Sequence, residues 1–403
     1  MAVNPEGSLE RATNRRRLLQ VLLNSGTASR VALAEWTGLS RPTVNSIIAD
    51  LETDGLVKKV GAVPSPGRHA ALYRVHTEAH TVIGIDIGGS RIRGALADLA
   101  GKTRVMRQIP TRSQEPGVVE RVVALSHQLL REGQVGPESL RAFAVGVPGV
   151  LNSLTGHMEN AINVPELEQL DLRHALQERL GVPGYVDNDA NMAIIGEHWL
   201  GRAKGTQDAV FIAVGNGLGA GILAGGSLQR GHTGFAGELD GIPVRRFPAH
   251  EEIADFSVEH FVTAKGIAEA YRSSPDDSDV ELPDIFSQAT SGSSRALGAV
   301  DQAAWYLAQV IMTIQGVLDP ERVILGGGIG AHPLTVGLVR SHLSQSRRFP
   351  LVVEPTGLDG QATLYGAIHT ALMHARLTVG MDANPDFTTT VPSPGQARGR
   401  AHL

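Results

Sequence analysis

The stretch Thr81–Leu96, TVIGIDIGGSRIRGAL, decides the fold of most of this chain. An apolar run rich in β-branched residues leads into Gly88 and Gly89, and a second apolar run follows at once, which is typical of two strands joined by a glycine turn. A second stretch, Ser29–Ile48, precedes it with the sequence SRVALAEWTGLSRPTVNSII and has the period of short helices separated by Gly38. The sequence therefore predicts two different folds in one chain.

The composition indicates a multidomain protein. The chain has 403 residues, 42% of them hydrophobic, so it is too long for one ordinary core. Its formal net charge is -5, but residues 1–80 hold 10 Lys+Arg against 7 Asp+Glu, which gives +3 there and leaves -8 for the remainder. Any contact with a phosphate backbone is expected in the N-terminal part. With Cys 0 and no apolar signal segment at the start, a reducing cytoplasm is the expected compartment.

One uncharged segment has the length of a membrane helix. Ala209–Gly226 runs for 18 residues without a charge, which meets the lower limit for a span. Its six glycines and Asn216 favour a strand, a glycine turn and a second strand, because glycine is poor in helix interiors. No membrane partner is expected.

The N-terminal eighty residues have the pattern of a winged helix-turn-helix. Arg15–Leu23 carries leucines at helical spacing, and a second helix is expected from about Ser29 to Thr37. After Gly38, Ser40 can cap a third helix, and Pro42 fits its first turn because proline needs no backbone donor there. Two helices joined by such a short turn form the DNA-reading unit of this motif.

Hydrogen-bonding side chains lie at the front of the third helix, where they could reach base edges in a major groove: Arg41, Thr43, Asn45 and Ser46. The next two apolar stretches flank a Pro/Gly-rich tip and predict a β-hairpin wing, with Arg68 placed for a minor groove or a phosphate. The alternative is a helical interaction domain without DNA. The turn, the cap, the wing and the local positive charge together favour double-stranded DNA as the partner.

From residue 81 onward, strands alternate with helices, which predicts an α/β fold. Three glycine turns end apolar stretches, and their backbone N–H groups could approach a phosphate. The residues assigned to these phosphate-binding loops are Asp86, Gly88, Gly89 and Ser90, then Gly215 and Gly217, then Gly327 and Gly328. Asp86 could in addition hold a metal-bound water. The second turn also satisfies the dinucleotide pattern G-x-G-x-x-A, but a strand follows it rather than a helix, which disfavours an NAD fold.

Polar residues follow a further apolar strand in VDNDAN, residues 186–191. A carboxylate at a strand end can accept a proton from a substrate hydroxyl while a neighbouring amide holds other hydroxyls. The alternative is that Asp187 or Asn188 only caps the helix that follows, and both roles can hold together.

These motifs resemble, in order and spacing, the ROK family of repressors and sugar kinases. They run over about residues 81–375 and comprise GIDIGGS, VGVPG, DNDAN with a following Gly-Glu, GNGLGAGI, GFAGELDG, VILGGGIG and YGAI. The resemblance implies a two-lobed actin-like ATPase fold with the ligand in the cleft, as a homodimer or homotetramer. It also implies that Asp189 stands at the kinases' general base, Asn188 and Glu238 at the sugar hydroxyls, and Glu259 at a second sugar-binding glutamate.

The departures from this family are informative. Members commonly continue from Gly-Glu through a small residue to Gly-His, and that histidine serves both the sugar and a structural zinc. Here Gly237–Gly241 reads GELDG, and the family's cysteine cluster has no counterpart because the chain has no cysteine. Asn216 replaces the usual threonine of the second loop. Neither zinc nor another required cofactor is expected. ATP and Mg²⁺ are expected only if the chain has kept kinase activity.

The expected division is a winged helix-turn-helix over 1–80, a first lobe over 81–190, a second lobe over 191–376 and a disordered tail over 377–403. The expected function is a transcription regulator, more specifically a repressor, that binds a sugar or sugar derivative and a pseudo-palindromic operator. One alternative is an ATP-dependent sugar kinase with an appended DNA-binding domain. Another is a pair of lobes that only dimerise. Release and recruitment of DNA by the ligand both stay open.

Overall fold

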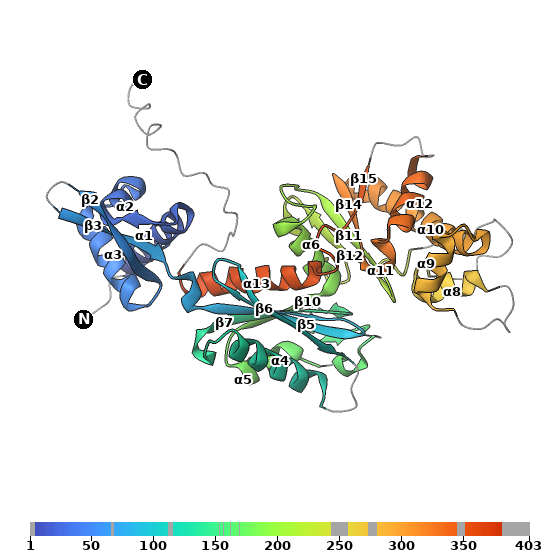
Figure 1. Ribbon diagram of the computed structural model, residues 1–403, viewed down its shortest axis with the longest axis horizontal. Helices are drawn as coiled ribbons and strands as arrows, with labels where there is room; N and C mark the ends of the chain where they lie inside the picture. Colours follow the sequence, from blue (N-terminus) through green and yellow to red (C-terminus); the bar gives the residue numbers. More distant parts are fainter. Residues whose placement is uncertain are drawn as a thin grey trace, which may run out of the picture.

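The computed structural model describes residues 5–65, 68–111, 116–152, 154–155, 157–161, 163–168, 170–242, 257–272, 280–344 and 351–380. A small N-terminal domain lies at one end, and two α/β lobes follow it (Figure 1). The disordered tail was predicted over 377–403, but α13 continues to Thr378, and only the residues after 380 lie outside the described part.

The N-terminal domain is a winged helix-turn-helix, as predicted. Its elements are α1 (Pro5–Ser25), β1 (Ala28–Ser29), α2 (Arg30–Thr37), α3 (Arg41–Thr53), β2 (Val57–Ser65) and β3 (Arg68–Val75). The Ser40 hydroxyl accepts from the backbone N–H of Thr43 at 3.3 Å, so the predicted cap is confirmed. α1 begins ten residues before the predicted start at Arg15, because the leucines used for the prediction mark only the half of the helix that packs on the domain core.

The first lobe is built on a five-stranded sheet in the order β10-β7-β4-β5-β6. Its strands are β4 (Thr81–Ile87), β5 (Arg91–Asp98), β6 (Thr103–Pro110), β7 (Leu140–Val147) and β10 (Gly184–Asn188). β4, β5 and β6 are antiparallel, whereas β7 and β10 run parallel to β4. One face carries α4 (Val118–Glu132) and α5 (Leu172–Leu180), and α13 (Ala362–Thr378) covers the other (Figure 1). α13 thus lies on the first sheet although it follows the second lobe in sequence.

The second lobe repeats this arrangement with the order β13-β12-β11-β14-β15. Its strands are β11 (Ala209–Val214), β12 (Leu218–Ala224), β13 (Ser227–Leu228), β14 (Arg322–Gly326) and β15 (Val352–Pro355). β11 and β12 form the strand, glycine turn and strand predicted for the uncharged segment. In the described part of the chain, no helix has both the length and the apolar character needed to cross a membrane.

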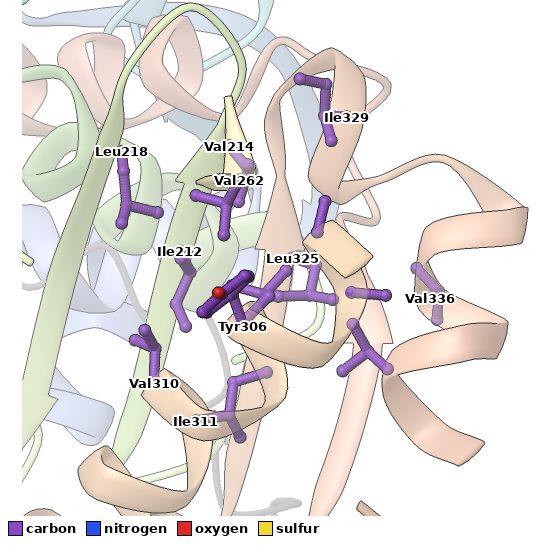
Figure 2. Packing of buried hydrophobic residues seen from close by; sticks show 14 of the residues in the cluster. Ile212, Val214, Leu218, Val262, Tyr306, Val310, Ile311, Leu325, Ile329 and Val336 are labelled. Atoms are coloured by element: carbon purple, nitrogen blue, oxygen red, sulfur yellow. The ribbon is translucent and has the colours of Figure 1, made fainter. Parts of the chain in front are cut away.

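Helices cover the second sheet and enclose the largest apolar core. They are α6 (Asp189–Leu200), α7 (Glu259–Val262), α8 (Ala264–Tyr271), α9 (Leu282–Thr290), α10 (Ser294–Leu318), α11 (Gly327–Gly330) and α12 (Pro333–Ser344). Tyr306 of α10 is fully buried at the centre, among side chains of the sheet and of α12 (Figure 2). Its ring stacks on Phe261 with the centroids 4.2 Å apart.

The shared topology brings the polar motifs to one region. Parallel strands end at the same edge of a sheet, so the loop after β4, the loop after β7 and the start of α6 lie together. The loops after β11 and β14 meet in the same way in the second lobe. Each predicted glycine turn therefore lies at the carboxyl end of a strand.

α6 and α13 cross with their backbones in contact. A Cβ added to Gly366 would overlap the carbonyl oxygen of Met192, and one added to Gly196 would overlap that of Ala362. Two helices can approach this closely only where both lack a side chain. Since α6 begins at Asp189, the crossing ties this predicted base to the last helix of the fold.

We expect Gly366→Ala to destabilise the protein by ~1–3 kcal/mol, because the added methyl group forces the helices apart. Alanine is intrinsically more favourable than glycine within a helix by about 1 kcal/mol, and this contribution opposes the destabilisation. Urea unfolding measures the difference. Gly298→Ala in α10 is the matched control, since nothing lies within 4 Å of its added Cβ, and it should stabilise. A higher free energy of unfolding for Gly366→Ala than for the wild type would contradict the close backbone contact between α6 and α13.

Candidate functional site

Three acidic side chains predicted for the sugar site meet in the cleft. Burial raises the pKa of Asp189 to about 7, and the carboxylates of Asp86 and Glu238 add to the effect. Burial also raises the pKa of Glu238 to about 7, with contributions from Asp240 and Glu259. The pKa of Glu259 is raised by burial as well. Asp189 therefore lies near Glu238, and Glu238 lies near Glu259.

A general base works best when its pKa lies near the operating pH. Asp189, with a pKa of about 7, meets that condition, and its place at the start of α6 fixes its direction. The hydroxyl of Thr363 on α13 donates to the Asp189 carbonyl at 3.1 Å and fixes the backbone from the other helix. The site can accept a proton from a ligand hydroxyl, and when protonated it can donate one.

Asn188 performs the helix-capping role that the sequence left as an alternative. Its Oδ1 accepts from the backbone N–H groups of Ala190 at 2.8 Å and Asn191 at 3.2 Å. Its Nδ2 donates to the carbonyl of Gly149 at 2.9 Å. Both ends of the amide therefore have partners within the protein, and contact with a sugar stays a prediction.

Asp187 links the two lobes through an ion pair that the sequence did not suggest. Nε and Nη2 of Arg230, which follows β13 of the second sheet, both donate to Asp187 Oδ2 at 2.7 Å. The Oδ1 atom of Asp187 accepts from Asn191 Nδ2 at 2.8 Å. Only tertiary structure brings the two charges together, since they lie 43 positions apart.

Asp86, whose carboxylate contributes to the raised pKa of Asp189, pairs with Arg93. The two residues are direct cross-strand neighbours on β4 and β5, and Arg93 Nη1 donates to Asp86 Oδ2 at 2.9 Å. Burial raises the pKa of Asp86 to about 6, against the opposing effect of Arg93. The glycine-turn motif points to Asp86 but not to Arg93, although the hairpin register predicts that the two face each other.

The first two glycine loops are tight turns that use part of their own backbone. Gly88 N–H donates to the Arg91 carbonyl at 2.9 Å, and Gly215 N–H donates to the Gly217 carbonyl at 3.0 Å. These two amides are therefore engaged within their turns. Ser90 is exposed and its carbonyl accepts from Thr111 N–H at 3.0 Å, which fixes the first loop.

Glu259 is held against the second glycine loop. Its Oε1 atom accepts from the backbone N–H of Leu218 at 3.2 Å, and a Cβ added to Gly217 would lie 3.2 Å from the same oxygen. Asn163 lies beside both loops, since Cβ atoms added to Gly89 and Gly217 would approach it at 3.4 and 3.6 Å. Asn163 is a candidate ligand contact that sequence reasoning missed, because it stands in a short irregular segment without periodicity.

The third glycine loop serves packing and a separate cavity. Gly327 has φ +76°, and an added Cβ would overlap the carbonyl oxygen of Val214, so glycine is required there. Gly328 lines a cavity of about 600 Å³ together with Phe286 and His332, whose ring centroids are 4.2 Å apart. Among the described residues, no group of three or more His, Asp or Glu side chains is arranged to hold a metal ion.

The candidate DNA-reading residues lie on the accessible front of α3. Arg41, Asn45 and Ser46 are exposed, and Thr43 is partly exposed with its hydroxyl 2.7 Å from that of Ser40. Arg68 begins β3, but its side chain lies outside the described part of the structure. The α3 residues therefore form a surface that DNA could approach.

The DNA-binding domain is fastened to the first lobe. Arg74 of the wing and Glu78 of the linker are paired at 2.5 and 3.0 Å, and the pKa of Glu78 is lowered to about 2 by this hydrogen bond. Arg104 of β6 donates to the Glu78 carbonyl at 2.9 Å. Leu99 N–H donates to the Thr77 carbonyl at 3.1 Å. The linker is thus bound on both sides rather than free.

The fold and the cleft define a DNA-binding head on a two-lobed, actin-like α/β domain. The chain belongs to the ROK family, whose model matches residues 82–374, and a model for winged helix-turn-helix DNA-binding domains matches residues 11–58. These matches confirm the predicted fold class.

Individual relatives include regulators and kinases. The xylose repressor of Bacillus spizizenii is 26% identical over 343 residues, covering 84% of this chain and 88% of that protein. The glucokinase of Halalkalibacterium halodurans is 30% identical over 264 residues, covering 61% and 80%. The crystal structure of a ROK family transcriptional regulator, a homologue of the Escherichia coli MLC protein, aligns with a TM-score of 0.69 at 21% identity and covers 92% of this chain and 98% of that one.

The raised pKa of Asp189 predicts a pH dependence of stability. The folded protein keeps a proton that the unfolded chain releases near pH 3.8, so this contribution is complete at low pH and is lost as the pH rises toward about 7. We expect Asp189→Asn to flatten the decline in unfolding free energy between about pH 4 and about pH 7, where the folded wild type holds up to roughly one more proton than the unfolded chain. Thr363→Val, which leaves the carboxyl in place, should keep the wild-type slope. Identical profiles for Asp189→Asn and wild type would contradict the assignment.

Proposed function

We propose that this chain is a DNA-binding transcription regulator, specifically a repressor, whose cleft binds a sugar or sugar derivative and thereby changes its affinity for an operator. The carboxylates of Asp189, Glu238 and Glu259 support a ligand rich in hydroxyl groups, because ionised carboxylates are hydrogen-bond acceptors only. The winged helix-turn-helix and the relatives named as repressors support the regulatory role.

The observation that carries this proposal is a continuous path from the cleft to the linker. α13 begins beside the cleft, where Thr363 contacts Asp189, and ends near the DNA-binding domain. Close to its end, the buried Arg376 donates to the Leu99 carbonyl from Nε at 3.1 Å and Nη2 at 2.8 Å. Leu99 in turn holds Thr77 of the linker.

The mechanism follows from this path. A ligand that draws the two lobes together shifts α6, and the close crossing passes the shift to α13 and from there to the linker. In a homodimer or homotetramer on a pseudo-palindromic operator, such a shift changes the distance between two recognition helices. Half-sites must lie on one face of the duplex, so operator affinity is sensitive to that distance.

The site of action is the cytoplasm, and no cofactor is required.

The second candidate function is an ATP-dependent sugar kinase, favoured by the pKa of about 7 at Asp189 and by the glucokinase relative. ATP consumption in the presence of pentoses, hexoses or amino sugars, abolished by Asp189→Asn, would establish it. We propose binding without turnover, because the Gly-His step of the kinase motif is replaced by Asp240 and Gly241.

We expect the wild-type protein to bind DNA from its own upstream region in a sequence-specific manner. Asn45→Ala should lower that affinity by ~1–3 kcal/mol, because an exposed asparagine on a recognition helix can form two hydrogen bonds to adenine. Fluorescence anisotropy with labelled operator and with unrelated DNA measures the loss. Gln128→Ala, at a partly exposed position of α4 in the first lobe, is the control. Equal affinities of wild type for both DNAs would contradict the regulatory function.

We expect the sugar that raises the thermal midpoint in a screen to change operator affinity as well. Glu238→Gln should abolish the thermal shift, whereas Arg376→Lys should keep it but reduce the effect of the sugar on DNA binding at least roughly fivefold. The reason is that lysine cannot form both hydrogen bonds to Leu99. Arg131→Gln, at an exposed site on α4, is the control. An unchanged sugar effect in Arg376→Lys would exclude this path.

A further inference from the structure

We propose that Arg93 takes the place of a metal ion at the phosphate end of the cleft, so that this chain does not hold a Mg²⁺–nucleotide complex at Asp86. The kinase branch of the fold implies such a complex, and Asp86 is the residue that the sequence assigned to a metal-bound water. The inference concerns a different ligand from the sugar, although Asp86 is close enough to Asp189 to contribute to its raised pKa.

The strand register places the two charges face to face. β4 and β5 pair as an antiparallel hairpin in which Asp86 is directly opposite Arg93, so both side chains point to the same face of the sheet. Arg93 Nη1 donates to Asp86 Oδ2 at 2.9 Å, and the side chain of Asp86 is only 8% exposed. A carboxylate buried to this degree is stable as an anion only beside a cation. Here the cation is part of the chain.

Arg93 is also held by a second partner. The same Nη1 donates to the carbonyl of Gly360 at 3.1 Å, in the loop before α13. This loop is fixed by Glu197, which is fully buried on α6 and accepts from the Gly357 N–H at 3.1 Å and from the Thr356 hydroxyl. The guanidinium therefore bridges oxygen atoms of two separate segments, which is the bonding pattern that a bound cation would have.

The cation already beside Asp86 argues against Mg²⁺ there. Magnesium takes six oxygen ligands at short distance and is usually held by one or two carboxylates. To reach Asp86 it would have to displace Arg93, whose backbone is fixed opposite that residue in the sheet, and the displaced guanidinium would stay beside a divalent cation. Arg93 thus occupies the position beside the carboxylate that the ion would need.

The test measures Mn²⁺ bound to the full chain in the presence of ADP, by the loss of the free-Mn²⁺ signal in electron paramagnetic resonance. We expect no specific binding by the wild type or by Arg93→Lys, which keeps the charge. Arg93→Gln should bind Mn²⁺ at least roughly tenfold more tightly than the wild type. Adding Asp86→Asn to Arg93→Gln should remove the gain, which locates the ion at Asp86.

Two further variants keep the result interpretable. Arg91→Gln removes a positive charge from the same strand at an exposed position and should behave as the wild type. Arg93→Ala provides a second neutral substitution if Arg93→Gln does not fold, as judged by thermal unfolding. Wild-type binding as tight as that of Arg93→Gln, or no gain in either neutral variant, would overturn the proposal. Operator binding is measured separately, so failure here leaves the regulatory function intact.

Discussion

The backbone contact between α6 and α13 is the constraint on which the rest of the structure depends. Gly196 and Gly366 allow the two helices to meet without intervening side chains, and neither helix can shift alone because close-packed backbones do not deform continuously. α6 begins with Asp189 beside the cleft. Near the end of α13, Arg376 donates to the Leu99 carbonyl. One helix pair therefore spans the distance between the ligand and the DNA-binding head. It also explains why a helix that follows the second lobe in sequence packs on the first.

Two arginines balance a cleft that is otherwise dominated by acids. Arg93 neutralises Asp86 within the first lobe, whereas Arg230 crosses from the second lobe to Asp187. The second pair is more than a charge contact, because Asp187 also holds Asn191 in the first turn of α6. A movement of one lobe against the other must therefore either carry the helix with it or break an ion pair that is largely buried on its acidic side. Either event acts on the first turn of α6, where Asp189 lies.

Local signals in the sequence predicted the local features correctly. The Ser40 cap, the wing and the strand pair around Gly215 depend on residues within a few positions of one another, and all three are present. Asn188 was ambiguous because capping and ligand binding use the same residue types at the same place. The Arg230–Asp187 pair and the position of Asn163 were not predictable, since they depend on how two sheets are placed. Arg93 lies between these two cases. Its pairing with Asp86 follows from the register of the hairpin, but the glycine turn in the sequence does not by itself fix that register.

The change from Gly-His to Asp240-Gly241 alters the chemistry of the sugar end in a defined direction. A histidine can carry positive charge or bind a metal, whereas Asp240 adds a carboxylate that raises the pKa of both Glu238 and Glu259. With pKa values of about 7, Asp189 and Glu238 exchange protons in the neutral range. A protonated carboxyl both donates and accepts a hydrogen bond, whereas an ionised one only accepts. The cleft can therefore match the oxygen acceptors of a ligand as well as its hydroxyl donors, and binding of hydroxyl donors favours proton release.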